Sequence, residues 1–89
     1  MYYVYLLQSL SDGSFYIGYT NDLKRRLDEH NNGKSKYTKF KKPFVLIFYE
    51  AFLNIDDAKA REEYLKSGWG RQSIKKLLKN HLAGSVSKQ

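Results

Sequence analysis

Two short tyrosine-bearing segments, Tyr3-Val4-Tyr5 and Tyr16-Ile17-Gly18, decide the fold of this 89-residue chain. They lie in two runs of aromatic and β-branched residues, 2–8 and 14–19, and such runs are typical of strands. The dipeptide Asp12-Gly13 between the runs favours a tight turn, because both of its positions tolerate positive φ. The chain is therefore predicted to begin with a β-hairpin.

The register of this hairpin predicts which side chains share a face of the sheet. If Asp12-Gly13 is a two-residue turn, then Tyr5, Tyr16 and Gly18 fall on one face. Any register in which paired residue numbers add up to an odd number keeps this arrangement, and an even total destroys it. The absence of a side chain at Gly18 leaves room beside two phenols for a close approach. The alternative is that the tyrosines only fill a core.

A helix, a third strand and two more helices are predicted after the hairpin. Asn21 is the expected N-cap of the first helix, which runs to about Asn31. The nearly continuous apolar run 44–52 predicts the third strand. A second helix follows from Asn54 to about Lys66, and a third from about 71 to 82, with an apolar face of Ile74, Leu77, Leu78 and Leu82. The order is ββαβαα, in one domain over residues 1–83 with a flexible C-terminal tail, 84–89.

Charge is distributed unevenly along the chain. The net charge is +7, cysteine is absent, and every acidic residue lies at or before Glu63. Segregated positive charge with interleaved aromatics predicts nucleic-acid binding, and the alternative is a basic surface that only keeps the protein soluble. No apolar run approaches the roughly 20 residues that span a bilayer, so a cytoplasmic protein is expected. The candidate nucleic-acid contacts are Lys34, Lys36, Tyr37, Lys39, Lys41, Lys42, Arg71 and Lys75.

The first predicted helix carries two polar residues on its inward face. Leu23, Arg26, Leu27 and His30 have the i, i+3, i+4, i+7 spacing of one stripe, whereas Glu29 is expected to point elsewhere. Arginine clamps phosphate oxygens with two parallel hydrogen bonds, and histidine titrates near neutral pH. The alternatives are an ion pair of Arg26 with Glu50 or Glu62, and a His30 that complements the helix dipole.

Glu62 is the candidate metal ligand. It lies in the middle of the second predicted helix, beside the stripe of Ala58, Leu65 and Trp69. A single carboxylate that faces an arginine and two phenols is a minimal site for one hard cation, which completes its shell with water and phosphate oxygens. The alternative is a Glu62–Lys66 pair on the surface of the helix.

These residues together resemble the GIY-YIG nuclease family, and within it the small stand-alone bacterial members. The second tripeptide is intact, and the first departs from the family name at Tyr3. The runs that are similar to the family are Tyr16-Ile17-Gly18-Tyr19-Thr20-Asn21-Asp22-Leu23-Lys24-Arg25-Arg26-Leu27 and Glu62-Glu63-Tyr64-Leu65-Lys66-Ser67-Gly68. The resemblance covers about residues 2–80. It implies an α+β fold with a small three-stranded antiparallel sheet flanked by helices.

The resemblance also implies a site and a reaction, the hydrolysis of phosphodiester bonds in DNA, of a structured or damaged kind. Its catalytic residues would be Tyr5, Tyr16, Arg26, His30 and Glu62. Glu62 would hold one Mg²⁺ or Mn²⁺, Arg26 would neutralise charge on the phosphate, and Tyr5 or Tyr16, assisted by His30, would take a proton from water.

Two other functions compete with this interpretation. One is a non-catalytic nucleic-acid-binding module of the same fold. The other is a protein-interaction domain that uses the surface around Trp69 and Tyr64. DNA rather than RNA is the expected partner of the nuclease, and a separate protein could target it to its substrate.

Overall fold

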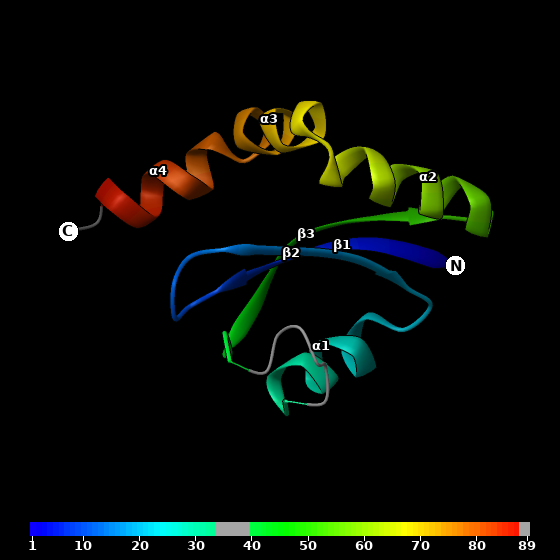
Figure 1. Cartoon of the computed structure of the whole chain (residues 1–89), viewed down its shortest axis with the longest axis horizontal. Helices are drawn as coiled ribbons and strands as arrows, with labels where there is room; N and C mark the ends of the chain where they lie inside the picture. The colour runs from blue at the N-terminus through cyan, green and yellow to red at the C-terminus, as the bar shows by residue number, and fades with distance from the viewer. Residues whose placement is uncertain (34–39, 88–89) are drawn as a thin grey trace.

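A three-stranded antiparallel sheet lies at the centre of the chain, with helices on both of its faces (Figure 1). The computed structural model describes residues 1–33 and 40–87. In the sheet order β2-β1-β3, the strands are β1 (Tyr2–Ser9), β2 (Phe15–Thr20) and β3 (Phe44–Phe52). The helices are α1 (Leu23–Asn31), α2 (Ile55–Lys66), α3 (Gly68–Leu77) and α4 (Lys79–Ser87). The predicted α+β class and antiparallel sheet are confirmed.

The central strand β1 buries side chains on both faces of the sheet. On one face Val4 and Leu6 belong to a cluster with Leu65 of α2 and Ile74 of α3. On the other face Tyr5 and Leu7 pack against apolar residues of α1. Figure 1 shows the same division, with α2, α3 and α4 on one side of the sheet and α1 on the other. Tyr5 therefore faces α1.

The hairpin turn is longer than predicted. Tyr5 pairs with Gly18 and not with residue 20, so the register differs by two residues from the expected one. The turn is stabilised by side chains: Ser9 Oγ accepts hydrogen bonds from the N–H groups of Ser11 (3.0 Å) and Asp12 (3.2 Å). These bonds favour a four-residue loop over the two-residue turn. The total of paired numbers stays odd, so the predicted common face of Tyr5 and Gly18 is confirmed.

Helix α1 begins one residue later than expected. Asp22 and not Asn21 is its N-cap: its backbone is extended, and its side chain accepts a hydrogen bond from the Arg25 N–H at 3.0 Å. The Asn21 side chain instead accepts a bond from the Arg25 guanidinium at 3.2 Å. At the other end of α1, the Asn31 amide accepts from the Phe44 N–H (2.6 Å) and donates to the Phe44 carbonyl (3.1 Å). The two bonds attach the end of α1 to the start of β3.

The predicted last helix consists of two helices. Helix α3 begins at Gly68, because Ser67 caps it by accepting a bond from the Gly70 N–H at 3.2 Å. It ends at Leu77, and Leu78 packs against the core between α3 and α4. Leu77, expected on the apolar face, is 58% exposed.

Helix α4 reaches the hairpin end of the sheet, where His81 Nε2 lies 3.0 Å from Gln8 Oε1. The tail expected from residue 84 overlaps the end of α4, and its flexibility stays a prediction. No helix in the described part of the chain is long and apolar enough to cross a membrane.

Candidate active site

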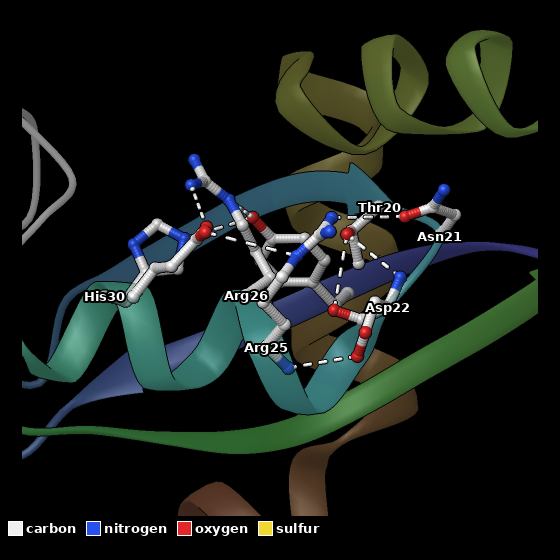
Figure 2. Close-up of polar contacts among 8 residues, drawn as sticks. Thr20, Asn21, Asp22, Arg25, Arg26 and His30 are labelled. Atoms are coloured by element: carbon white, nitrogen blue, oxygen red, sulfur yellow. Dashed lines mark hydrogen bonds and ion pairs between the residues drawn. The ribbon is translucent and has the colours of Figure 1, made fainter.

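Three side chains meet at the Tyr5 hydroxyl group. Its oxygen lies 3.1 Å from His30 Nε2 and accepts a hydrogen bond from Arg26 Nε at 3.3 Å. Arg26 and His30 come from successive turns of α1, and Figure 2 shows both extending from that helix toward the sheet. The structure thus brings together residues 5, 26 and 30, which confirms the predicted common face of Arg26 and His30.

Gly18 makes this meeting point possible. It is the partner of Tyr5 on β2, and a Cβ atom at this position would lie 2.5 Å from the Tyr5 hydroxyl oxygen. Any larger residue would therefore push the phenol away from Arg26 and His30. The close approach that the sequence predicted beside Gly18 is made by Tyr5 itself.

The network holds its groups in defined protonation states. Burial raises the pKa of Tyr5 to about 12, so the phenol is neutral at pH 7. Burial and the nearby Arg26 cation lower the pKa of His30 to about 4, so the imidazole is neutral too. Because Tyr5 Oη already accepts a bond from Arg26, its own proton is available to His30 Nε2. Complementing the helix dipole requires a charged imidazole, which the lowered pKa of His30 disfavours.

Arg26 has an acidic partner that the sequence prediction missed. Its Nη1 donates to Glu29 Oε1 at 2.9 Å, and Glu29 also lies 4.0 Å from Arg25. Burial alone would lower the pKa of Arg26, but the bonds to Glu29 and Tyr5 raise it above its usual value. Of the two carboxylates considered in the alternative, Glu50 pairs with Arg61 at 2.7 Å and Glu62 pairs with Lys66. The i, i+3 spacing of Arg26 and Glu29 is the signal that could have identified the pair.

Tyr16 lies beside this network. Its ring centroid is 4.6 Å from that of His30 and 6.3 Å from that of Tyr5, on which it stacks. Tyr16 is half-buried, whereas Tyr5 is 3% exposed and His30 fully buried. Of the two phenols, Tyr16 is therefore the one that solvent reaches more readily.

A hollow of about 490 Å³ opens at the end of β2, where the chain passes into α1. Arg26 and Glu29 form part of its wall, and the Arg26 side chain is 32% exposed. The guanidinium is thus fixed by Tyr5 on one side and accessible to an anion on the other. The remaining lining residues are Tyr2, Tyr19, Thr20, Asn21, Arg25 and Ile55.

Glu62 approaches the site from α2. Its side chain is 16% exposed and its carboxylate lies 3.2 Å from Lys66 Nζ, so the alternative pair is present. Its charge nevertheless reaches Tyr5, where it adds to the rise in pKa that burial causes. Within residues 1–33 and 40–87 no group of three or more His, Asp or Glu side chains could hold an ion. One carboxylate fits a hard cation such as Mg²⁺ with a shell of water and phosphate, and does not fit a closed metal site.

The candidate nucleic-acid contacts fall in separate places. Lys41 and Lys42 are exposed before β3, and Lys41 lies 3.8 Å from Asp12. Arg71 and Lys75 are exposed on α3, on the face of the sheet opposite α1. The other four, Lys34, Lys36, Tyr37 and Lys39, lie outside the described residues.

Comparisons with known proteins agree with this geometry. A UPF0213 protein of Streptococcus pneumoniae is 46% identical over 65 residues, which is 72% of this chain and 65% of the relative. A UPF0213 protein of Streptococcus agalactiae is 42% identical over 80 residues, which is 89% of each chain. The solution NMR structure of a UPF0213 protein from Bacillus halodurans matches with a TM-score of 0.54 and 38% identity, covering 86% of this chain and 85% of that one. Residues 1–76 match the GIY-YIG catalytic domain, and the chain therefore belongs to the GIY-YIG family.

Proposed function

We propose that this protein is a metal-dependent endonuclease that hydrolyses phosphodiester bonds in DNA of a structured or damaged kind. Membership of a nuclease family supports the reaction class. The observation that carries the proposal is the position of Arg26, whose guanidinium is held by Tyr5 and borders an open hollow. A fixed, accessible arginine beside two phenols and a carboxylate is suited to a phosphate group that gains charge during hydrolysis.

In this proposal Arg26 binds the phosphate at the bond to be cut. The hydrogen bond from Nε to Tyr5 restricts the orientation of the guanidinium, so less conformational freedom is lost when phosphate binds. Without a substrate, the Glu29 carboxylate pairs with the Arg26 guanidinium. A bound phosphate would replace Glu29 in this pair. Arg26 then stabilises the negative charge that grows on the phosphoryl oxygens.

The two phenols have different roles. Tyr5 stays protonated because burial raises its pKa to about 12, so it positions Arg26 and His30 and takes no proton from water. Tyr16 is the more accessible phenol. We propose that it takes the proton from the attacking water. The Arg26 cation lies close enough to Tyr16 for the two groups to interact electrostatically.

Glu62 would hold the metal ion. A bound Mg²⁺ or Mn²⁺ would supply charge stabilisation at the phosphate and the leaving oxygen. The Glu62 carboxylate is mostly buried on α2, and its partner Lys66 is a surface side chain that can move away. Exposed basic side chains would contact flanking phosphates, and such contacts weaken as the salt concentration rises. These side chains are Lys41, Lys42, Arg71 and Lys75.

A cleavage assay tests the proposal. Labelled single-stranded, duplex, flap and branched DNA and an RNA strand are incubated with Mg²⁺ and the parent protein, Arg26→Ala or Glu62→Gln. Lys24→Ala is the matched control, because Lys24 is an exposed cation on the same helix that does not line the hollow. We expect Mg²⁺-dependent cutting that Arg26→Ala and Glu62→Gln lose and Lys24→Ala keeps. Cutting that survives in both variants would contradict the assigned site.

A non-catalytic nucleic-acid-binding module is the second candidate. It is favoured by the ion pairs Arg26–Glu29 and Glu62–Lys66, which neutralise both charged groups of the site within the chain. This function predicts binding without cutting for any divalent metal, and no effect of Glu62→Gln on affinity.

A further inference from the structure

Trp69 is an exposed aromatic residue that the packing of the fold does not explain. It is the only tryptophan of the chain, lies in the first turn of α3, and is 80% exposed. Within residues 1–33 and 40–87 its indole N–H has no hydrogen-bond partner and its ring no aromatic neighbour. A single exposed aromatic side chain is common, but exposed aromatic side chains that lie together on one surface mark binding sites.

A second aromatic side chain lies next to the face of α3 that Trp69 occupies. Ser73 is one helical turn after Trp69, so the two residues share a face. The Tyr64 hydroxyl group lies 3.1 Å from Ser73 Oγ, which brings this half-exposed ring from α2 to the same face. The Arg61 guanidinium lies 5.4 Å above the Tyr64 ring and further restricts it. We call Tyr64, Trp69 and Ser73 the aromatic surface.

Basic side chains follow the aromatic surface along the chain, and one of them shares its helix face. No acidic residue follows Glu63 in the sequence. Lys76 lies two turns after Trp69 and on the same helix face. In the described part of the chain no carboxylate pairs with the exposed basic residues that follow Trp69, which are Arg71, Lys75, Lys76 and Lys79.

We propose that the aromatic surface binds an unpaired nucleic-acid strand, with a base stacked on Trp69 and phosphates on Lys76 and on the basic side chains further along the chain. Stacking on an aromatic ring next to cationic groups is how proteins hold single strands without sequence preference. A duplex hides the faces of its bases, so the bound strand must be unpaired. A protein partner fits less well, because lysine is depleted at the centres of protein interfaces.

The aromatic surface lies close to the proposed metal ligand. Lys66 is one helical turn, or about 6 Å, beyond Glu62. Three further residues lead to Trp69, so the Cα atoms of Glu62 and Trp69 are at most about 17 Å apart. If the proposed nuclease function holds, and only then, a strand bound at Trp69 would lie within reach of the proposed metal ligand, Glu62. The substrate would then contain a junction between paired and unpaired DNA.

Tryptophan fluorescence tests the binding without any cleavage, because Trp69 is the only source of the signal. The parent protein is titrated with single-stranded oligothymidylate in EDTA at about 0.15 M salt, and in parallel with a duplex of equal length. We expect the single strand to quench the emission and the duplex to leave it nearly unchanged. Equal quenching by the duplex, or no quenching by either, would overturn the proposal, and the second result would favour a protein partner.

Variants then assign the binding to the indole ring, with affinity measured from the anisotropy of a labelled oligonucleotide. We expect Trp69→Ala to bind about 5- to 100-fold more weakly, and Trp69→Phe, which keeps a stacking face, to bind nearly as the parent does. Leu53→Ala is the matched control, since Leu53 is 84% exposed and precedes α2 at its far end from α3. Unchanged affinity of a folded Trp69→Ala protein would overturn the proposal. Failure of the cleavage assay would leave this result untouched.

Discussion

The Tyr5 hydroxyl group lies against Gly18 of the neighbouring strand, where a Cβ atom would come within 2.5 Å of the phenol oxygen. Gly18, the glycine of the second tripeptide, thus leaves the space that Tyr5, the tyrosine of the first tripeptide, occupies. It gives the phenol the space to contact Arg26 and His30 at the same time. The two tripeptides therefore form one unit, and a change in either disturbs the same hydrogen bonds.

Gly18→Ala is expected to displace the Tyr5 ring and to disrupt the site. Overpacking at such a position costs about 1–3 kcal/mol of unfolding free energy, and cleavage should fall by more than the loss of folded protein explains. Unfolding in urea and initial cleavage rates measure both effects. Gly68→Ala is the control, because no atom lies within 4 Å of a Cβ built there. Full activity of Gly18→Ala would show that the position of the Tyr5 hydroxyl group is unimportant.

His30 is expected to make the stability fall as the pH falls from about 6.5 to 4. In the unfolded chain the imidazole binds a proton near pH 6.5, whereas burial lowers its pKa in the folded protein to about 4. The neutral form therefore stabilises the fold above pH 6.5, and up to about 3 kcal/mol is lost by pH 4. Urea unfolding at several pH values measures the slope.

The chain has two histidines, and one variant of each shows which of them causes the pH dependence of the unfolding free energy. His30→Gln should flatten the dependence between pH 6.5 and 5. His81→Gln, which changes an exposed residue, should keep it. The same slope in both variants would place its origin in other groups.

Glu29→Gln is expected to lower the KM for nucleic acid several-fold while kcat changes little. The carboxylate binds the Arg26 guanidinium at 2.9 Å and so competes with a phosphate. Both side chains are one-third exposed, so the loss in stability should stay near 0.5 kcal/mol. Steady-state kinetics measure the effect, with Asp28→Asn, an equal change of charge on the same helix, as the control. A raised KM would show that Glu29 positions Arg26.

Asn31→Ala is expected to lower the free energy of unfolding by about 1–3 kcal/mol, because it removes two hydrogen bonds to the Phe44 backbone and leaves both groups without their partner. Chemical denaturation measures the change. Asn32→Ala, at the exposed neighbouring position, should stay within about 0.5 kcal/mol of the parent. Equal values for the two variants would mean that water replaces the Asn31 amide at no cost.

The faces of the strands and of α1 could be predicted from the sequence because they depend only on side-chain periodicity. The register error of two residues in the hairpin left Tyr5 and Gly18 on one face, since the period of a strand is two. The helical period likewise placed Arg26 and His30 together on the inner side of α1. Both patterns tolerate errors in the ends of the elements.

Contacts that depend on particular side chains could not be predicted in this way. The hairpin turn is set by Ser9 Oγ, whose bonds to the backbone no strand pattern contains. The ion pair of Arg26 with Glu29 has the i, i+3 spacing of a helical pair, but the spacing does not tell which of several possible carboxylates Arg26 contacts. The break between α3 and α4 lies at Leu78, which packs against the core, a tertiary contact that helical periodicity does not reveal.

The residues of the site are synthesised at different times, because they lie far apart in the sequence. Tyr5, Tyr16, Arg26 and His30 all precede residue 32, whereas Glu62 belongs to a helix that follows the third strand. A nascent chain still missing α2 would therefore carry the phenols, the cation and the imidazole without the acidic group from the other side of the sheet. Under the proposed function, competence to cut would therefore appear only after synthesis has passed α2, which carries Glu62.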